Sequence, residues 1–130
     1  MIGVHSAVVD QTWHDRTMLV AFSVAPTSSG ESVADAVADA VRVVRESGLP
    51  YRLDSMFTTI EGEWDEVFEV IKRATEAVGR HGPRVQLVIK ADIRPGYEGQ
   101  LDAKVERVEQ ILNRADASKA SESSAATERG

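Results

Sequence analysis

Residues 51–64 read Y-R-L-D-S-M-F-T-T-I-E-G-E-W, and their pattern is the strongest indication of the fold of this chain. Residues 51–54 and 56–61 read as two short extended segments with a bend near Asp54. The connection between them is too short for a crossover, so the two segments are expected to pair as an antiparallel hairpin. Gly62 ends the hairpin, and the acidic residues that follow it favour the start of a helix.

The chain before the hairpin predicts one strand and one helix. Residues 18–25 form an apolar run that is closed by Pro26 and turn-forming residues, a pattern typical of a strand. Valines then recur at helical spacing until Gly48 and Pro50 stop the helix. The valines expected to face the core are Val33, Val37, Val41 and Val44.

The chain after the hairpin predicts a helix, a strand and a last helix. The first helix begins near Glu63 and ends at Gly82, and residues 85–93 alternate between apolar and polar side chains as a half-buried strand does. The stripe expected to be buried on the first helix is Trp64, Val67, Phe68, Ile71, Ala74 and Val78. Leu101, Val105, Val108 and Leu112 follow at helical spacing and predict an amphipathic helix.

The resulting order, β-α-β-β-α-β with a C-terminal helix, predicts an α+β fold of the ferredoxin-like type. In this sandwich two helices cover one face of a four-stranded antiparallel sheet, and the strands at 18–25 and 56–61 are central. Strand alternation then places Ser23, Phe57, Thr59 and Glu61 on the open face. Because that face is half apolar and half polar, we expect a homo-oligomer in which another copy covers it around a small polar pocket.

The predicted ferredoxin-like domain spans residues 18–113. Residues 1–17 show no sustained period and are interpreted as an N-terminal extension, with Val8 and Val9 as a candidate edge strand. Residues 114–130 contain no apolar residue larger than alanine and are rich in Ser, Ala and charge, which predicts a disordered tail.

Composition argues against several classes of function. The chain has 15 basic and 21 acidic residues and a net charge of −6, which disfavours a nucleic-acid partner. It has no cysteine, and its three histidines lack a metal-ligand spacing, so neither a metal site nor a cofactor is expected. We expect a cytoplasmic protein without a membrane partner, because no apolar stretch approaches the roughly 20 residues that span a bilayer.

Four segments together resemble the thiamine-binding protein family related to YkoF. They are M-L-V-A-F-S-V-A-P from Met18, S-G-L-P-Y-R-L from Ser47, T-T-I-E-G-E-W-D-E-V from Thr58 and V-Q-L-V-I-K-A-D-I-R from Val85. The resemblance spans about residues 18–112 and a single copy of the domain. It implies a non-catalytic protein that binds thiamine or its hydroxymethyl-pyrimidine moiety and assembles as a homodimer or homotetramer.

Glu61 is the principal candidate ligand-binding residue. A carboxylate can accept hydrogen bonds from the amino group and from the protonated ring nitrogen of an aminopyrimidine. Phe57 could pack on the ring, while Thr58, Thr59 and Ser23 could supply hydroxyl groups.

Structural alternatives remain open for each of these residues. Glu61 could favour the dipole of the following helix or pair with Lys90, and the threonines could be ordinary strand formers. Two other functions are also open: a ligand-sensing regulatory module, and an acylphosphatase-like hydrolase. The hydrolase would need an arginine in the loop after the first strand, and residues 26–30 contain none.

Overall fold

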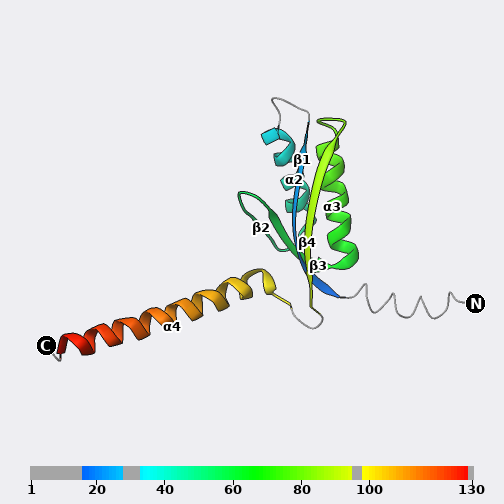
Figure 1. Cartoon of the computed structure of the whole chain (residues 1–130). Helices are drawn as coiled ribbons and strands as arrows, with labels where there is room; N and C mark the ends of the chain where they lie inside the picture. Colours follow the sequence, from blue (N-terminus) through cyan, green and yellow to red (C-terminus); the bar gives the residue numbers. More distant parts are fainter. Residues whose placement is uncertain (1–15, 28–32, 95–97, 129–130) are drawn as a thin grey trace, which may run out of the picture.

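The computed structural model describes residues 16–27, 33–94 and 98–128, which form a sheet, two covering helices and a long C-terminal helix (Figure 1). The elements are β1 (Thr17–Pro26), α2 (Val33–Ser47), β2 (Tyr51–Leu53), β3 (Thr58–Glu63), α3 (Trp64–Gly79), β4 (Val85–Ile93) and α4 (Gln100–Glu128). The sheet is antiparallel with the strand order β2-β3-β1-β4, so β1 and β3 are central. The predicted ferredoxin-like α+β fold is confirmed. The candidate edge strand at Val8 and Val9 lies outside the described residues.

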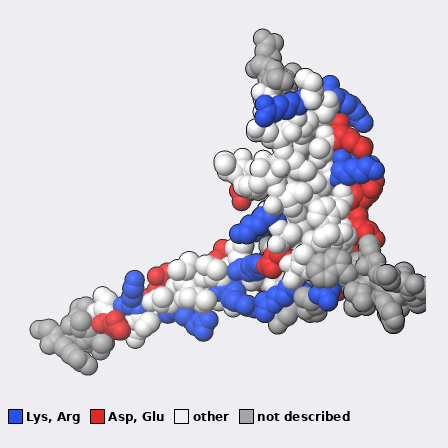
Figure 2. All heavy atoms as spheres, turned by 45° about the vertical axis from the view of Figure 1, so that its right-hand side comes forward, with Lys and Arg blue, Asp and Glu red and all other residues white. Residues whose placement is uncertain are grey.

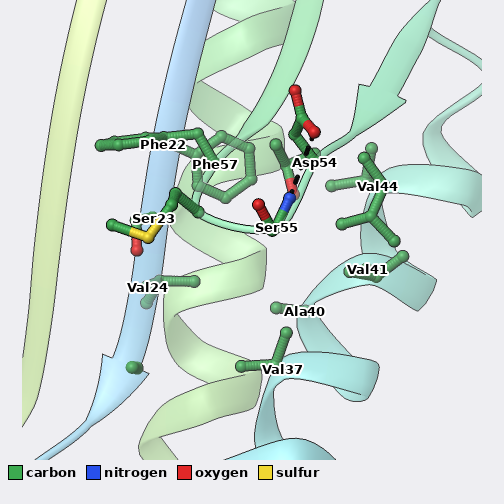
Figure 3. Close-up of a pocket in the computed structure, with 14 residues that line it drawn as sticks. Phe22, Ser23, Val24, Val37, Ala40, Val41, Val44, Asp54, Ser55 and Phe57 are labelled. Carbon is green, nitrogen blue, oxygen red and sulfur yellow. Dashed lines mark hydrogen bonds between the residues drawn. The ribbon is translucent and has the colours of Figure 1, made fainter.

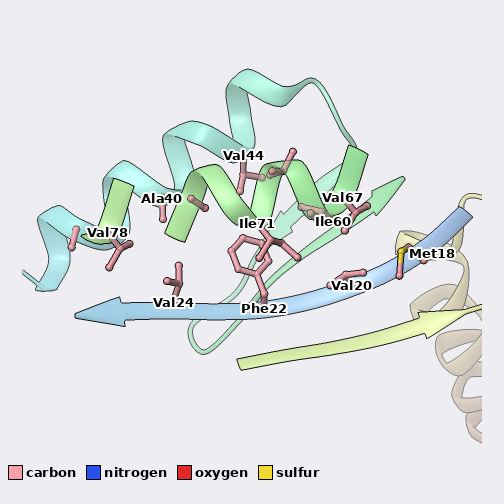
Figure 4. Close-up of a cluster of buried hydrophobic side chains, with 13 residues drawn as sticks. Met18, Val20, Phe22, Val24, Ala40, Val44, Ile60, Val67, Ile71 and Val78 are labelled. Atoms are coloured by element: carbon pink, nitrogen blue, oxygen red, sulfur yellow. The ribbon is translucent and has the colours of Figure 1, made fainter. Parts of the chain in front are cut away.

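The hydrophobic core lies between the sheet and the helices α2 and α3 (Figure 4). Alternate residues of β1 point into it, and Val20 and Phe22 are at most 2% exposed. On β3, Ile60 lies opposite Val20 and is fully buried. Burial of one such side chain stabilises the fold by about 1.5–3 kcal/mol.

Helix α2 presents a different face to the core from the one that its valines predict. Its buried residues are Ala36, Ala40 and Val44, whereas Val33 is 44% exposed. Small alanines let the helix backbone lie close to the sheet and to α3, so the helix is turned about its axis relative to the expectation. Val37 and Val41 are thereby placed beside a pocket that is described below.

Helix α3 buries its predicted stripe. Val67, Ile71, Ala74 and Val78 are buried, while Trp64 and Phe68 are partly buried and pack against each other with ring centroids 4.7 Å apart. A capping box between Glu63 and Glu66 begins the helix.

Strand β4 is more exposed than the half-buried strand that the sequence predicts at residues 85–93. Its helix-facing residues Leu87 and Ile89 are 40% and 38% exposed. The reason is position, because β4 is an edge strand and the helices lie mainly over β1 and β3.

Helix α4 leaves the sandwich and extends away from it through Glu128 (Figure 1). Residues 114–128, for which the sequence predicts a disordered tail, are the second half of this helix. The physical reason for the difference is helix propensity, because residues 100–128 contain neither Gly nor Pro and many Ala, Glu, Lys and Arg. None of the helices in the described part of the chain combines the length and hydrophobicity needed to cross a membrane.

Candidate functional site

Glu61 lies on the open face of β3 and caps the beginning of α4. Its side chain sits opposite Leu19 of β1, and the residue is 7% exposed. One carboxylate oxygen, Oε1, accepts a hydrogen bond from the backbone N–H of Gly99 at 3.1 Å, and Oε2 accepts one from Gln100 at 2.6 Å. A carboxylate in this position satisfies two otherwise unpaired amides and complements the helix dipole. Glu61 therefore holds the start of α4 against the sheet.

Two ion pairs from neighbouring strands hold the same turn of α4. Arg52 of β2 pairs with Asp102, and Asp92 of β4 pairs with Lys104. The ammonium group of Lys104 lowers the pKa of the Asp92 carboxyl below its usual value. The hollow beside Glu61 measures only about 10 Å³, which is about the space of one water molecule. In this form of the protein, the surroundings of Glu61 have no room for a heterocycle.

A larger pocket lies between β1, α2 and the turn that joins β2 to β3 (Figure 3). Its volume is about 140 Å³. Its walls come from β1, from α2 and from the whole turn: Phe22, Ser23, Val24, Ala25, Val37, Ala40, Val41, Val44, Leu53, Asp54, Ser55, Met56, Phe57 and Thr58. The pocket is therefore mostly apolar, with its polar side chains concentrated at the turn.

The turn is closed by its own hydrogen bonds. The backbone N–H of Asp54 donates to the carbonyl of Phe57 at 2.9 Å, and Asp54 Oδ1 accepts from the backbone N–H of Ser55 at 3.3 Å. Figure 3 shows Phe57 beside Phe22, with Asp54 and Ser55 on the turn next to them. This arrangement brings two aromatic rings, a carboxylate and a hydroxyl group to one pocket.

The predicted site residues fall into two groups. Ser23, Phe57 and Thr58 line this pocket, whereas Thr59 and Glu61 do not. Thr59 lies opposite Ala21, on the open face of the sheet. The structure thus separates Glu61 and Thr59 from Phe57, Ser23 and Thr58.

The sequence did not predict Asp54 and Ser55 at the pocket, because their pattern indicated only a bend. It also assigned Val37 and Val41 to the core. Ala36 and Ala40 could have indicated that Val37 and Val41 face away from the core, because the two alanines mark a second possible buried face on the same helix.

A wide, shallow groove adjoins the pocket along the outer side of α2. It shares Val37, Val41 and Leu53 with the pocket, and Arg42 and Arg45 also line it. The Arg45 Nε donates a hydrogen bond to the hydroxyl of Tyr51 at 3.1 Å. The groove therefore offers positive charge a short way from the apolar pocket.

A separate polar contact joins α2 to the end of α3. His81 Nε2 and Asp39 Oδ2 are 2.6 Å apart, and Arg42 pairs with the same carboxylate at 2.8 Å. The contact with His81, followed by that with Arg42, lowers the pKa of Asp39. Within residues 16–27, 33–94 and 98–128, no group of three or more His, Asp or Glu side chains is placed to hold a metal ion.

The pocket, the hairpin and the first turns of α4 all lie in a segment that matches a known family. A model of thiamine-binding proteins matches residues 20–109. The chain belongs to the thiamine-binding protein family. The match covers the sheet, both covering helices and the first turns of α4, and it ends before the second half of α4.

Known proteins and solved structures resemble this chain over about two thirds to three quarters of its length. A UPF0045 protein of Mycobacterium bovis is 52% identical over 99 residues, which are 75% of this chain and 97% of that protein. A solved domain of unknown function, DUF77, from Bacillus cereus is 36% identical, with a TM-score of 0.63 over 69% of this chain and 88% of that one. A putative thiamine biosynthesis/salvage protein from Thermotoga maritima is 19% identical with a TM-score of 0.61, over 69% of this chain and 98% of that one, and shares the fold.

Proposed function

We propose that this chain binds thiamine or its hydroxymethyl-pyrimidine moiety without turnover, works as a homo-oligomer, and holds the pyrimidine ring in the pocket between α2 and the β2–β3 turn. The main support for the proposal is the pocket itself. It has a volume of about 140 Å³, mostly apolar walls and a carboxylate at the turn. Membership of the thiamine-binding protein family selects this ligand class among the small heterocycles that would fit.

The pocket matches a single substituted ring in size and in chemistry. An apolar cavity of about 150 Å³ is enough for a benzene-sized ring. Phe22 and Phe57 would pack against the heterocycle, and the Asp54 carboxylate would accept from its amino group and protonated ring nitrogen. Asp54 would thus perform the chemistry that the sequence assigned to Glu61. Ser23 and Thr58 would contribute as predicted, through hydroxyl groups at the wall.

The direct ligand roles of Glu61 and Thr59 stay predictions. Both oxygens of Glu61 accept hydrogen bonds from Gly99 and Gln100 at the start of α4, and the hollow beside them measures only about 10 Å³, so a ligand could reach them only if α4 left the sheet. We propose that Glu61 acts mainly by placing α4, and the titration below separates the two roles.

The groove along α2 suggests which part of a longer ligand lies outside the pocket. A ligand whose ring fills the pocket would extend past Leu53 towards Arg42 and Arg45. Guanidinium groups pair well with phosphate. A phosphate ester of thiamine is therefore expected to bind more tightly than thiamine itself.

Isothermal titration calorimetry with thiamine, thiamine phosphate and hydroxymethyl-pyrimidine tests the proposal. Asp54→Asn should weaken binding of all three ligands about 10- to 100-fold, because one charge-assisted hydrogen bond is worth about 1.5–3 kcal/mol. Asp35→Asn is the matched control, since Asp35 is an exposed carboxylate on α2 outside the pocket. Chromatography of the recovered ligand should show it unchanged.

Three results would count against parts of the proposal. Absence of heat with every ligand, for a folded protein, would remove the function. A normal affinity for Asp54→Asn together with a large loss for Glu61→Gln would move the site to the open face. A ligand recovered in altered form would mean turnover.

A further inference from the structure

The first half of α4 carries an apolar stripe that no other element in the described part of the chain covers. Val105, Val108, Ile111 and Leu112 are between 44% and 56% exposed. They follow one side of a helix that has already left the sandwich (Figure 1). A stripe of this width is typical of a helix that packs on another surface, and long helices gain most of their stability from such packing.

The open face of the sheet is the second uncovered surface. Both covering helices lie on the other side (Figure 4). Leu19 and Ala21 of β1 and Val88 of β4 belong to this open face, and Val88 is 55% exposed. Figure 2 shows a broad uncharged surface on the sandwich above the point where α4 departs.

We propose that α4 of one copy of this chain lies across the open sheet face of a second copy, and that the second copy returns the same contact. Each copy supplies one stripe and one open face, so a two-fold pair covers both surfaces of both copies. A single chain cannot do this for itself, because Glu61 and the pairs at Arg52 and Asp92 fix the first turn of its own α4 at the sheet's end.

The dimensions of the two surfaces agree. The stripe from Val105 to Leu112 is about 10 Å long at 1.5 Å per residue. Four strands span about 14 Å at roughly 4.8 Å between neighbours. The stripe can therefore cross the central strands of a second copy.

The charges beside the stripe also complement the open face. Asp102, Glu109 and Asp116 recur every seven residues, so they form an acidic row along one side of the stripe. Asp102 already pairs with Arg52, an open-face residue of its own chain. Lys90 is exposed on the open face opposite Ala21. In the exchanged pair, Glu109 of one copy meets Lys90 of the other.

This inference rests on the homo-oligomer of the proposed function, and light scattering of the full-length protein tests that part first. Val105→Asp combined with Val108→Asp should convert the oligomer to smaller species, because it places two charges in the apolar contact. Gln110→Asp combined with Asn113→Asp adds the same charge to the side of α4 away from the centre of the stripe, and should leave the assembly unchanged. A monomeric wild type, or equal effects of the two variants, would overturn the proposal.

Crosslinking then tests the arrangement. Because the sequence contains no cysteine, only the introduced cysteines can react. Ala21→Cys with Val108→Cys should give a covalent dimer with a short bismaleimide, whereas Ala21→Cys with Gln110→Cys should give much less. Strong crosslinking of Val108→Cys alone would indicate that the two α4 helices pack on each other, and would contradict the packing of α4 on the sheet of the other copy. If the protein is an oligomer but Ala21→Cys and Val108→Cys do not crosslink, the exchange of α4 between copies would be wrong, and the homo-oligomer would still stand.

A charge exchange gives a third readout. Lys90→Glu and Glu109→Lys should each weaken association, and the double variant should recover most of the loss. Failure of the double variant to recover would contradict the pairing. Ligand titration is a separate measurement, so a wrong prediction about the α4 contact can be distinguished from a wrong prediction about thiamine binding.

Discussion

Glu61 places a carboxylate where only 7% of the residue is exposed, and the backbone amides of Gly99 and Gln100, at the start of α4, compensate for its removal from water. Burying a charge is costly unless it is hydrogen-bonded, so this contact matters to stability whether or not a ligand ever reaches it. At the scale of residues, strand alternation was enough to put Glu61 on the open face. It could not identify the amide partners, because they lie 38 and 39 positions further along the chain.

Glu61→Gln is expected to lower the free energy of unfolding by about 1–3 kcal/mol. The amide keeps the shape of the side chain but turns an acceptor into an NH₂ group that faces a backbone N–H, and it removes the charge. Urea unfolding followed by circular dichroism measures the loss. Glu69→Gln, an exposed change on α3, is the control and should stay within about 0.5 kcal/mol of wild type. Equal stability of the two variants would argue against the capping role.

At the scale of elements, the turn after α2 depends on a backbone conformation that glycine adopts without strain. Gly48 follows the last residue of α2 with φ +76°, and a Cβ built on it would touch nothing within 4 Å. Gly79, the last residue of α3, has a Cβ position in ordinary contact with Val85 at 3.9 Å. Two glycines at helix ends thus have different requirements, one conformational and one not.

Alanine substitution at these two positions should therefore have opposite effects. Gly48→Ala is expected to destabilise the protein by about 1–2 kcal/mol through backbone strain alone. Gly79→Ala is expected to be neutral or to stabilise it by up to about 1 kcal/mol, because alanine loses less backbone entropy in a helix. Thermal unfolding of both variants beside wild type checks the signs, and a loss at both positions would contradict this account.

For the molecule as a whole, the described residues of the sandwich and of the extended α4 leave two apolar surfaces exposed. Association that covers them couples stability to protein concentration. The net stability of a folded domain is only about 5–15 kcal/mol, so an intermolecular contribution is large relative to the total.

Wild-type Tm is accordingly expected to rise with protein concentration, by about 2–5 °C for each tenfold increase. The estimate follows from about 1.4 kcal/mol per tenfold for a dimer that dissociates on unfolding. Val105→Asp combined with Val108→Asp should have a Tm independent of concentration, and differential scanning calorimetry over two decades makes the comparison. A flat wild-type profile at concentrations where the protein is partly monomeric would contradict it.

The amino-acid sequence alone is enough to predict the order of elements, the hairpin at residues 51–61, the two central strands and the face on which Glu61 lies. These features depend on periodicity, turn residues and chain length between segments, which are local properties of the chain. Even the family was recognisable, because four segments keep their order and spacing.

Three features depend on packing in three dimensions: which face of α2 is buried, what Glu61 contacts and where a ring-sized pocket lies. Valines and alanines on α2 offer two possible stripes, and close packing against α3 and the sheet selected the alanines. That choice turned Val37 and Val41 towards the Asp54 turn and made the pocket. Likewise, local helix propensity extends α4 to Glu128, but only contacts from three strands set the direction in which it leaves the sheet.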